Sequence, residues 1–432
     1  KLVVTSAGDE WIWQGAEGVT GSDTNTGAMW GIEGSTDTAA GKNLIFNSTG
    51  AGTVTLSGAV NPASITVNNA AGSDYVFVSN GTGIIAHVSL IKRGDGNLVL
   101  ILDNTVLNVY ISVQQGELVA QVANSLGSGA ITVTDGVLTL ATADVQPGMG
   151  MINLQGGSLN LASGSFATAF TADNMTWTGG SMTLGEEVAA TVAKALANGK
   201  AVELADGSVL TVSGANDNSA LNLNASGSGT VSVGLGTSYG ANVLNMSTEF
   251  QGILSVTSGY FQLNNVTMGA DGILKLADSN VRTEWNGTAG GTFANDVVFT
   301  GNQVFATKDF TFSGDLSGTA FSTQGAGNIT LAGGVNLDGQ LKVHRGTVTV
   351  NSADVAKLGD SIDIQNNSTL AFARDFSYGG VISGTAGSTV SVNAGTLELT
   401  GANTFLGALS IAGGATARLG DGSAWAGSRS GC

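Results

Sequence analysis

Apolar and small polar residues alternate along most of this chain, and the alternation is clearest between residues 378 and 420. Three short runs there place apolar side chains two positions apart: Val390 and Val392, Leu397 and Leu399, Leu409 and Ile411. A period of two is typical of a strand with one buried face, and glycine after each run can turn the chain within a few residues. Because one such coil cannot bury its apolar face alone, the pattern predicts a stack of similar coils.

The same alternation continues over the rest of the chain, interrupted by Gly, Asn, Asp or Ser. The apolar positions that we expect to face the core are Val54, Leu56, Ile65, Val67, Tyr75, Phe77, Leu98, Leu100, Val109, Ile111, Val113, Leu118, Ile131, Val133, Val137, Leu138, Leu140, Val202, Leu204, Leu210, Val212, Leu221, Leu223, Val231, Val233, Leu244, Leu254, Val256, Phe261, Leu263, Leu274, Leu276, Val297 and Phe299. These runs predict an all-β solenoid with roughly twenty residues in each coil and a rise of about 4.8 Å per coil.

One segment departs from the period of two. In residues 185–199 the apolar positions follow a helical spacing, at Val188, Val192, Ala195 and Leu196. Glutamates at 186 and 187 and Lys194 further on suit the helix dipole, and Asn198-Gly199 provides a stop. The sequence therefore predicts one short decorating α-helix near 185–198, with Val192 packed on the solenoid and Lys194 in solvent.

The region 378–420 also carries a spaced motif. Gly-Val-Ile-Ser-Gly at 380–384 is followed by Gly-Thr-Leu-Glu-Leu-Thr-Gly-Ala-Asn-Thr-Phe-Leu-Gly at 395–407, and Leu-Gly closes the motif at 419–420. In these residues the chain resembles the passenger-associated repeat of bacterial autotransporters, with degenerate copies near 90–105 and 324–350. The resemblance implies a right-handed parallel β-helix, secreted from or displayed on the surface of a Gram-negative bacterium. Clear matches cover a minor part of the chain.

The first fifty residues contain Trp11, Trp13 and Trp30 ahead of the strand-like run 44–46. Large aromatic side chains can cover the open end of a solenoid, so we expect residues 1–50 to form an amino-terminal cap. The alternative is a sugar platform built by these indoles. The solenoid body is expected at 51–426, and residues 427–432 are interpreted as a tail without an assigned role.

Composition and charge narrow the classes of function. With 66 Gly, 2 Pro, 42% hydrophobic and 11% charged residues, the chain is too apolar for a disordered protein and too rich in glycine for a helical one. The net charge of -17 disfavours nucleic acid and anionic membranes as partners and favours a monomer. The single cysteine, Cys432, excludes an intrachain disulfide and a thiolate zinc cluster. No apolar run approaches the roughly 20 residues of a membrane-spanning helix, and no signal peptide is visible at Lys1.

Candidate chemistry is sparse. Arg93-Gly94-Asp95 has the sequence of an integrin-binding tripeptide, but its position between two alternating runs favours a glycine turn. His87 and His344 lie far from cysteine or clustered carboxylates, which disfavours a histidine metal site. The Gly-x-Ser-x-Gly pattern at 236–240 is interpreted as a chance match in a chain so rich in glycine and serine.

Carboxylates are the remaining candidates, because the 32 Asp and Glu residues can meet across neighbouring coils and form an acid beside a base. No Asp-Thr-Gly or Asp-Ser-Gly motif supports such a pair, and Asp206-Gly-Ser and Asp421-Gly-Ser are interpreted as turns. We therefore assign no catalytic residue, no metal ligand and no cofactor.

Three hypotheses remain at this point. The protein is a displayed or secreted passenger that binds extracellular glycans or proteins, a carboxylate hydrolase acting on mucin-like glycoproteins, or a passive stalk. We favour binding without catalysis, because long walls of repeated side chains suit many weak contacts with a repetitive ligand.

Overall fold

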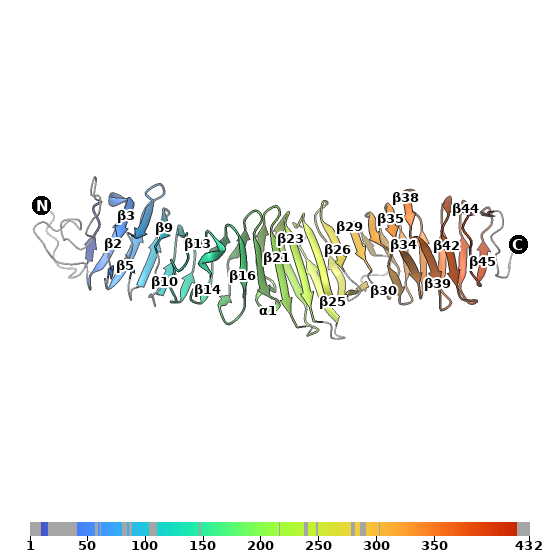
Figure 1. Ribbon diagram of the computed structural model, residues 1–432, viewed down its shortest axis with the longest axis horizontal. Coiled ribbons are helices and arrows are strands. Elements are labelled where there is room, and N and C mark those ends of the chain that lie inside the picture. The colour runs from blue at the N-terminus through green and yellow to red at the C-terminus, as the bar shows by residue number, and fades with distance from the viewer. Residues whose placement is uncertain are drawn as a thin grey trace, which may run out of the picture. The chain divides into compact units, whose positions relative to one another are not determined.

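The computed structural model describes residues 10–15, 41–56, 59–60, 62–79, 84–85, 89–102, 110–146, 148–215, 217–236, 241–247, 249–277, 281–285, 291–301 and 303–420. The chain divides into two compact units, unit 1 (residues 1–211) and unit 2 (residues 212–432). In each unit parallel strands stack coil upon coil into a β-solenoid (Figure 1). The described residues form about 16 turns. The all-β solenoid is confirmed, whereas its right-handedness and the boundaries at 50 and 426 stay predictions.

Unit 1 contains two long parallel sheets and a shorter third one. Sheet A consists of β1 (Glu10–Ile12), β2 (Asn43–Asn47), β5 (Ser64–Asn68), β8 (Ser89–Arg93), β10 (Tyr110–Val113), β12 (Ile131–Val133), β14 (Ile152–Leu154) and β17 (Met175–Trp177). Sheet B consists of β3 (Gly52–Leu56), β6 (Tyr75–Ser79), β9 (Asn97–Ile101), β11 (Glu117–Ala120), β13 (Val137–Leu140), β15 (Ser158–Leu161), β18 (Ser181–Leu184) and β20 (Ala201–Leu204). Sheet C contains β16 (Ser165–Phe170), β19 (Ala189–Ala193) and β21 (Val209–Gly214), and a small pair joins β4 (Ala59–Val60) to β7 (Ile84–Ile85).

Strand register keeps equivalent side chains in rows that run from coil to coil. In sheet B, Leu118 pairs with Leu138, Leu138 with Leu159, and Leu159 with Met182. These pairs are separated by 20, 21 and 23 residues, close to the predicted coil length. All four side chains are fully buried, and a buried aliphatic side chain contributes about 1.5–3 kcal/mol relative to an exposed one. The rows are therefore the core of the unit.

The predicted core positions are buried with three exceptions. Val137 is half-buried, Val109 lies outside the described residues, and Ile411, predicted to share the buried face with Leu409, is 46% exposed in the strand Ala408–Ile411. Sheet A contains one further departure, because its second inward row places a lysine among apolar side chains: Phe46, Val67, Lys92, Val113, Val133, Leu154 and Trp177.

Trp11 and Trp13 lie at the amino-terminal end of sheet A, and both indoles are buried. The indole Nε1–H of Trp13 donates to the carbonyl of Gly50 at 3.0 Å, and the centroid of the Trp13 ring lies 5.9 Å from that of the Phe46 ring. Neither face is open for a sugar, so the sugar platform is wrong for these two residues. Trp30 lies outside the described residues, and the cap at 1–50 stays a prediction.

The described residues contain one α-helix, as predicted, but this helix is much shorter than the predicted segment 185–198. Helix α1 covers Lys194–Ala197, whereas Ala189–Ala193 forms strand β19, in which Val192 pairs with Phe170 of β16. A spacing of four residues, as between Val188 and Val192, fits a period of two as well as a helix. The burial of Ala190 between them shows that the strand period applies.

Helix α1 replaces a strand of sheet A. It follows β19 and precedes β20, the place in the coil that a sheet A strand holds in the earlier coils, and sheet A ends with β17. Lys194 is 5% exposed, so its predicted position in solvent is also wrong.

Unit 2 contains four parallel sheets. Sheet D consists of β23 (Thr230–Leu235), the first part of β25 (Ile253–Val266), β26 (Ile273–Ala277), β29 (Asp296–Thr300), β32 (Leu316–Thr319), β35 (Val335–Asp338) and β38 (Val355–Leu358). Sheet E consists of β22 (Leu221–Gly227), β24 (Ala241–Met246), the second part of β25, β27 (Val281–Trp285), β30 (Gln303–Ala306), β33 (Ser322–Gln324), β36 (Gln340–Val343), β39 (Ser361–Ile364) and β42 (Val381–Gly384). Sheet F consists of β28 (Gly291–Phe293), β31 (Phe310–Phe312), β34 (Asn328–Leu331), β37 (Thr347–Val350), β40 (Thr369–Phe372), β43 (Thr389–Val392) and β45 (Ala408–Ile411), and sheet G of β41 (Phe376–Tyr378), β44 (Thr396–Leu399) and β46 (Thr416–Leu419).

Strand β25 passes through the corner between sheets D and E. Residues from Ile253 pair with β23 and β26, and residues from Gly259 pair with β24 and β27. Gly259 has φ +117, a backbone conformation that residues with a Cβ rarely adopt. The glycine therefore lets one strand serve two walls.

Candidate binding surfaces

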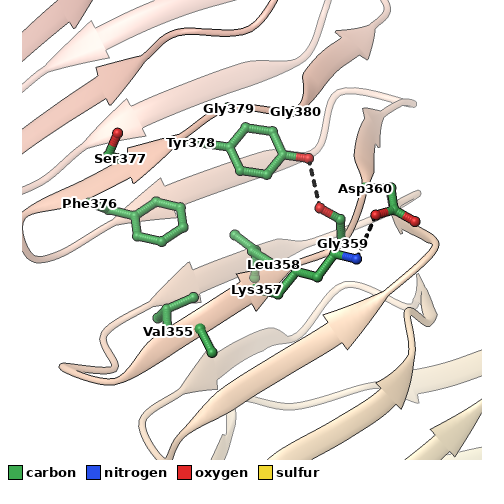
Figure 2. A pocket seen from close by; sticks show the side chains of 11 residues that line it. Val355, Lys357, Leu358, Gly359, Asp360, Phe376, Ser377, Tyr378, Gly379 and Gly380 are labelled. Carbon is green, nitrogen blue, oxygen red and sulfur yellow. Dashed lines mark hydrogen bonds and ion pairs between the residues drawn. The ribbon is translucent and has the colours of Figure 1, made fainter.

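An open pocket of about 320 Å³ lies in unit 2 beside β38 and β41. It is lined by residues 355–360 and 376–380. Figure 2 shows the Tyr378 hydroxyl directed at Gly359, to whose carbonyl it donates a hydrogen bond of 3.2 Å. A Cβ on Gly380 would lie 2.4 Å from that hydroxyl oxygen, so only glycine leaves room for the bond.

A lysine lies between two carboxylates at the rim of this pocket. Lys357 Nζ is 2.6 Å from Asp338 Oδ1 and 2.7 Å from Asp360 Oδ1, and Asp360 Oδ2 accepts a hydrogen bond from the Gly339 N–H at 3.0 Å. The hydrogen bond from Lys357 lowers the pKa of the Asp360 carboxyl, and the bond to Asp338 raises the pKa of the Lys357 ammonium. A catalytic acid needs a carboxyl whose pKa is raised instead. The contact with Lys357 therefore favours the ionised form of Asp360, and a general acid requires the protonated form.

Gly94 and Asp95 of the Arg93-Gly94-Asp95 tripeptide lie in the turn between β8 and β9, as the sequence predicts, and Arg93 is the last residue of β8. Gly94 has φ +70, and a Cβ there would lie 2.4 Å from the Asn69 carbonyl oxygen. Beneath the turn, Lys92 Nζ donates to the carbonyls of Arg93, Gly94 and Gln115 at 2.6, 2.7 and 3.3 Å. Backbone geometry therefore accounts for the glycine and lysine of this segment.

We expect Gly94→Ala to destabilise unit 1 by about 2–4 kcal/mol, because it combines a strained backbone with a clash. Gly72→Ala is the matched control, since Gly72 has φ +77 but no atom within 4 Å of its Cβ position. It should cost about 1 kcal/mol. Urea denaturation of the two variants measures the difference, and equal midpoints would show that the turn can move to accommodate the methyl group.

The other candidates from the sequence do not assemble into a site. His344 is half-buried, with Nδ1 3.2 Å from Gln324 Nε2, and Asp206 lies in the turn between β20 and β21. His87, Asp421 and most of the 236–240 pattern lie outside the described residues. Within the described ranges, no group of three or more His, Cys, Asp or Glu side chains could hold a metal ion.

The outer face of sheet A carries a surface that the apolar pattern did not reveal. We call it the Tyr110 wall, and it consists of the outward residues of β10, β12, β14, β17 and the positions just before and after them: Tyr110, Ser112, Gln114, Ala130, Thr132, Thr134, Met151, Asn153, Gln155, Asn174, Thr176 and Thr178. These twelve residues are described, and none of them is charged. They form three rows, each with one residue per coil. In the middle row Ser112 and Thr132 are 6% and 7% exposed, so a ligand would reach the wall mainly at the other residues.

Hydrogen bonds between coils order the side chains of the Tyr110 wall. The Tyr110 hydroxyl lies 3.1 Å from Thr132 Oγ1, and the Thr176 hydroxyl donates to Asn153 Oδ1 at 2.9 Å. Because the Tyr110 hydroxyl reaches the next strand, its ring leans along the wall. Tyr110 is nevertheless 49% exposed. The signal in the sequence that identifies the wall is the polar half of the alternation in Tyr110-Ile-Ser-Val-Gln114, because the apolar half alone indicates the core.

Comparisons with known proteins match no family model, no curated protein and no solved structure. In the part of the chain that the structure describes, no helix is long and apolar enough to cross a bilayer.

Proposed function

We propose that this protein is a secreted or surface-displayed, autotransporter-like passenger that binds extracellular glycans or proteins without cleaving them. The observation that carries the proposal is the Tyr110 wall, where uncharged and mostly polar side chains repeat in register from coil to coil. An extended ligand that meets several coils gains affinity from many weak contacts. The repeat motif at 378–420 supports the extracellular setting by resemblance.

The carboxylate hydrolase is the second candidate, and the pocket in unit 2 does not favour it. Asp338 and Asp360 are close together, but both contact Lys357. Stabilising the ionised form of Asp360 is the opposite of what a general acid requires.

The test is to incubate the protein with mucin, extracellular matrix proteins and a glycan array while the pH is varied from about 3 to 8. We expect saturable binding and intact ligands at every pH. A bell-shaped rate of cleavage that disappears in Asp360→Asn would establish the hydrolase instead. Asp309→Asn is the matched control, because Asp309 is an exposed carboxylate of the same unit outside the pocket.

A further inference from the structure

We propose that the Tyr110 wall binds an uncharged, linear β-1,4-linked polysaccharide that runs along its rows, across the strands. This inference rests on the proposed function and adds the site and the chemical class of the ligand. Three observations carry it: the exposed tyrosine ring, the spacing of the rows and the neutrality of the wall.

The first observation concerns the tyrosine. An aromatic ring that lies along a surface presents an apolar face to the C–H bonds of a pyranose ring, while neighbouring polar groups bind the hydroxyls. The Tyr110 ring is held over the next coil by its contact with Thr132 and stays half exposed. Ala130 and Met151 follow Tyr110 in the same row, so the first three residues of this row present an apolar strip.

The second observation concerns spacing. Neighbouring parallel strands lie about 4.8 Å apart, which is roughly the length of one sugar residue in an extended β-1,4 chain. A chain that runs along the rows therefore meets one new set of side chains with each sugar.

The Gln155 side chain forms no hydrogen bond to any described residue, and its exposed amide offers both a donor and an acceptor. Thr134 and Thr178 flank Gln155 in its row and are exposed; each hydroxyl donates to a backbone carbonyl, of Val113 and of Leu154, at 3.4 Å and can still accept a hydrogen bond from a ligand.

The third observation concerns charge. The protein has a net charge of -17, yet these four coils present no charged side chain on the wall. The nearest cations lie at the two ends of the wall, where Arg93 Nε donates to Gln114 Oε1 at 2.7 Å and Lys200 Nζ to the Thr178 carbonyl at 3.3 Å, and both keep their charge. Along the wall itself no cation offsets the negative net charge of the protein, which repels an anionic polysaccharide and leaves a neutral one unaffected.

Binding is measured by isothermal titration with glucomannan, cellohexaose and mannohexaose, and polygalacturonate serves as the anionic probe. We expect the wild-type protein to bind at least one of the three neutral probes and not polygalacturonate. Tyr110→Ala should weaken that binding about tenfold, the loss of one aromatic contact, and Tyr110→Phe should keep most of it. Leu406→Ala is the matched control, because Leu406 is 54% exposed in unit 2, and it should bind as the wild type does.

A second variant protects the test against misfolding. Gln155→Glu places a charge on an exposed side chain without internal bonds, so it should fold normally and still bind the neutral probe more weakly. Preference for polygalacturonate, or equal affinity in the wild type, Tyr110→Ala and Gln155→Glu, would overturn the wall proposal. If the wild type then still binds mucin or a matrix protein, the general binding function survives. Binding to none of these ligands would remove both.

Discussion

Replacing Lys92 by methionine should destabilise unit 1 in a way that grows with pH. Lys92 is 0% exposed in a row of apolar side chains, and burial lowers the pKa of its ammonium to about 8. In the unfolded chain the pKa is about 10.4, so between these two pH values the unfolded state binds more protons than the folded state. The contribution of Lys92 to stability therefore rises as the pH increases from about 8 to 10.

At neutral pH the Lys92→Met substitution has two opposite effects on the unfolding free energy, and they nearly cancel. Methionine removes the cost of burying a charge, but it leaves the carbonyls of Arg93, Gly94 and Gln115 without the Lys92 donor. Toward pH 10 the wild-type lysine is neutral and still donates, so methionine keeps only the loss. We expect the difference in unfolding free energy to increase by on the order of 2 kcal/mol between pH 7 and pH 10.

Urea denaturation of the wild type and Lys92→Met at each pH measures this difference. Tyr75, whose pKa burial raises to about 12, affects both proteins alike and cancels. Lys342→Met is the matched control, since Lys342 is an exposed strand residue, and its effect should be small and constant. A constant difference for Lys92→Met as well would show that the ammonium remains hydrated in the fold.

The sequence predicts the solenoid because burial in a stack of coils imposes a period of two on nearly every strand. Leu118, Leu138 and Leu159 illustrate this, because each lies in an alternating run and each is fully buried in the same row. Coil length follows from the same spacing. The exact register does not, because the spacing between paired residues varies, being 19 between Val297 and Leu316 and 25 between Val67 and Lys92, and the loops between strands absorb the difference.

The candidate surfaces depend on that register and are harder to predict. Lys357 and Asp338 are 19 residues apart, so their contact exists only when β38 lies against β35 with one particular offset. Tyr110 and Thr132 meet in the same way across 22 residues. Composition gives the number of carboxylates and hydroxyls, but a shift of one residue would turn these side chains to the other face of the sheet.

In segment 185–199 the spacing of apolar residues fits both a helix and a strand, and the structure shows that residues 189–193 form a strand. This strand leads to the second prediction, a large loss of stability when Val192 is replaced. Val192 is 0% exposed in strand β19, where it pairs with Phe170. Val192→Asp would place a carboxylate in the core without a partner, so we expect a loss of about 4 kcal/mol or more in the stability of unit 1.

The control for Val192→Asp lies three residues further on, in helix α1. Ala195 is exposed, and Ala195→Asp should cost less than about 1 kcal/mol. Lys194 is not a suitable control, because it is buried beside Ala195. Thermal and urea denaturation should therefore separate the variants clearly: Val192→Asp lowers both midpoints, and Ala195→Asp stays close to the wild type. Similar midpoints for the two variants would mean that residues 189–197 detach from the coils as a unit, and that β19 is not part of the packed core.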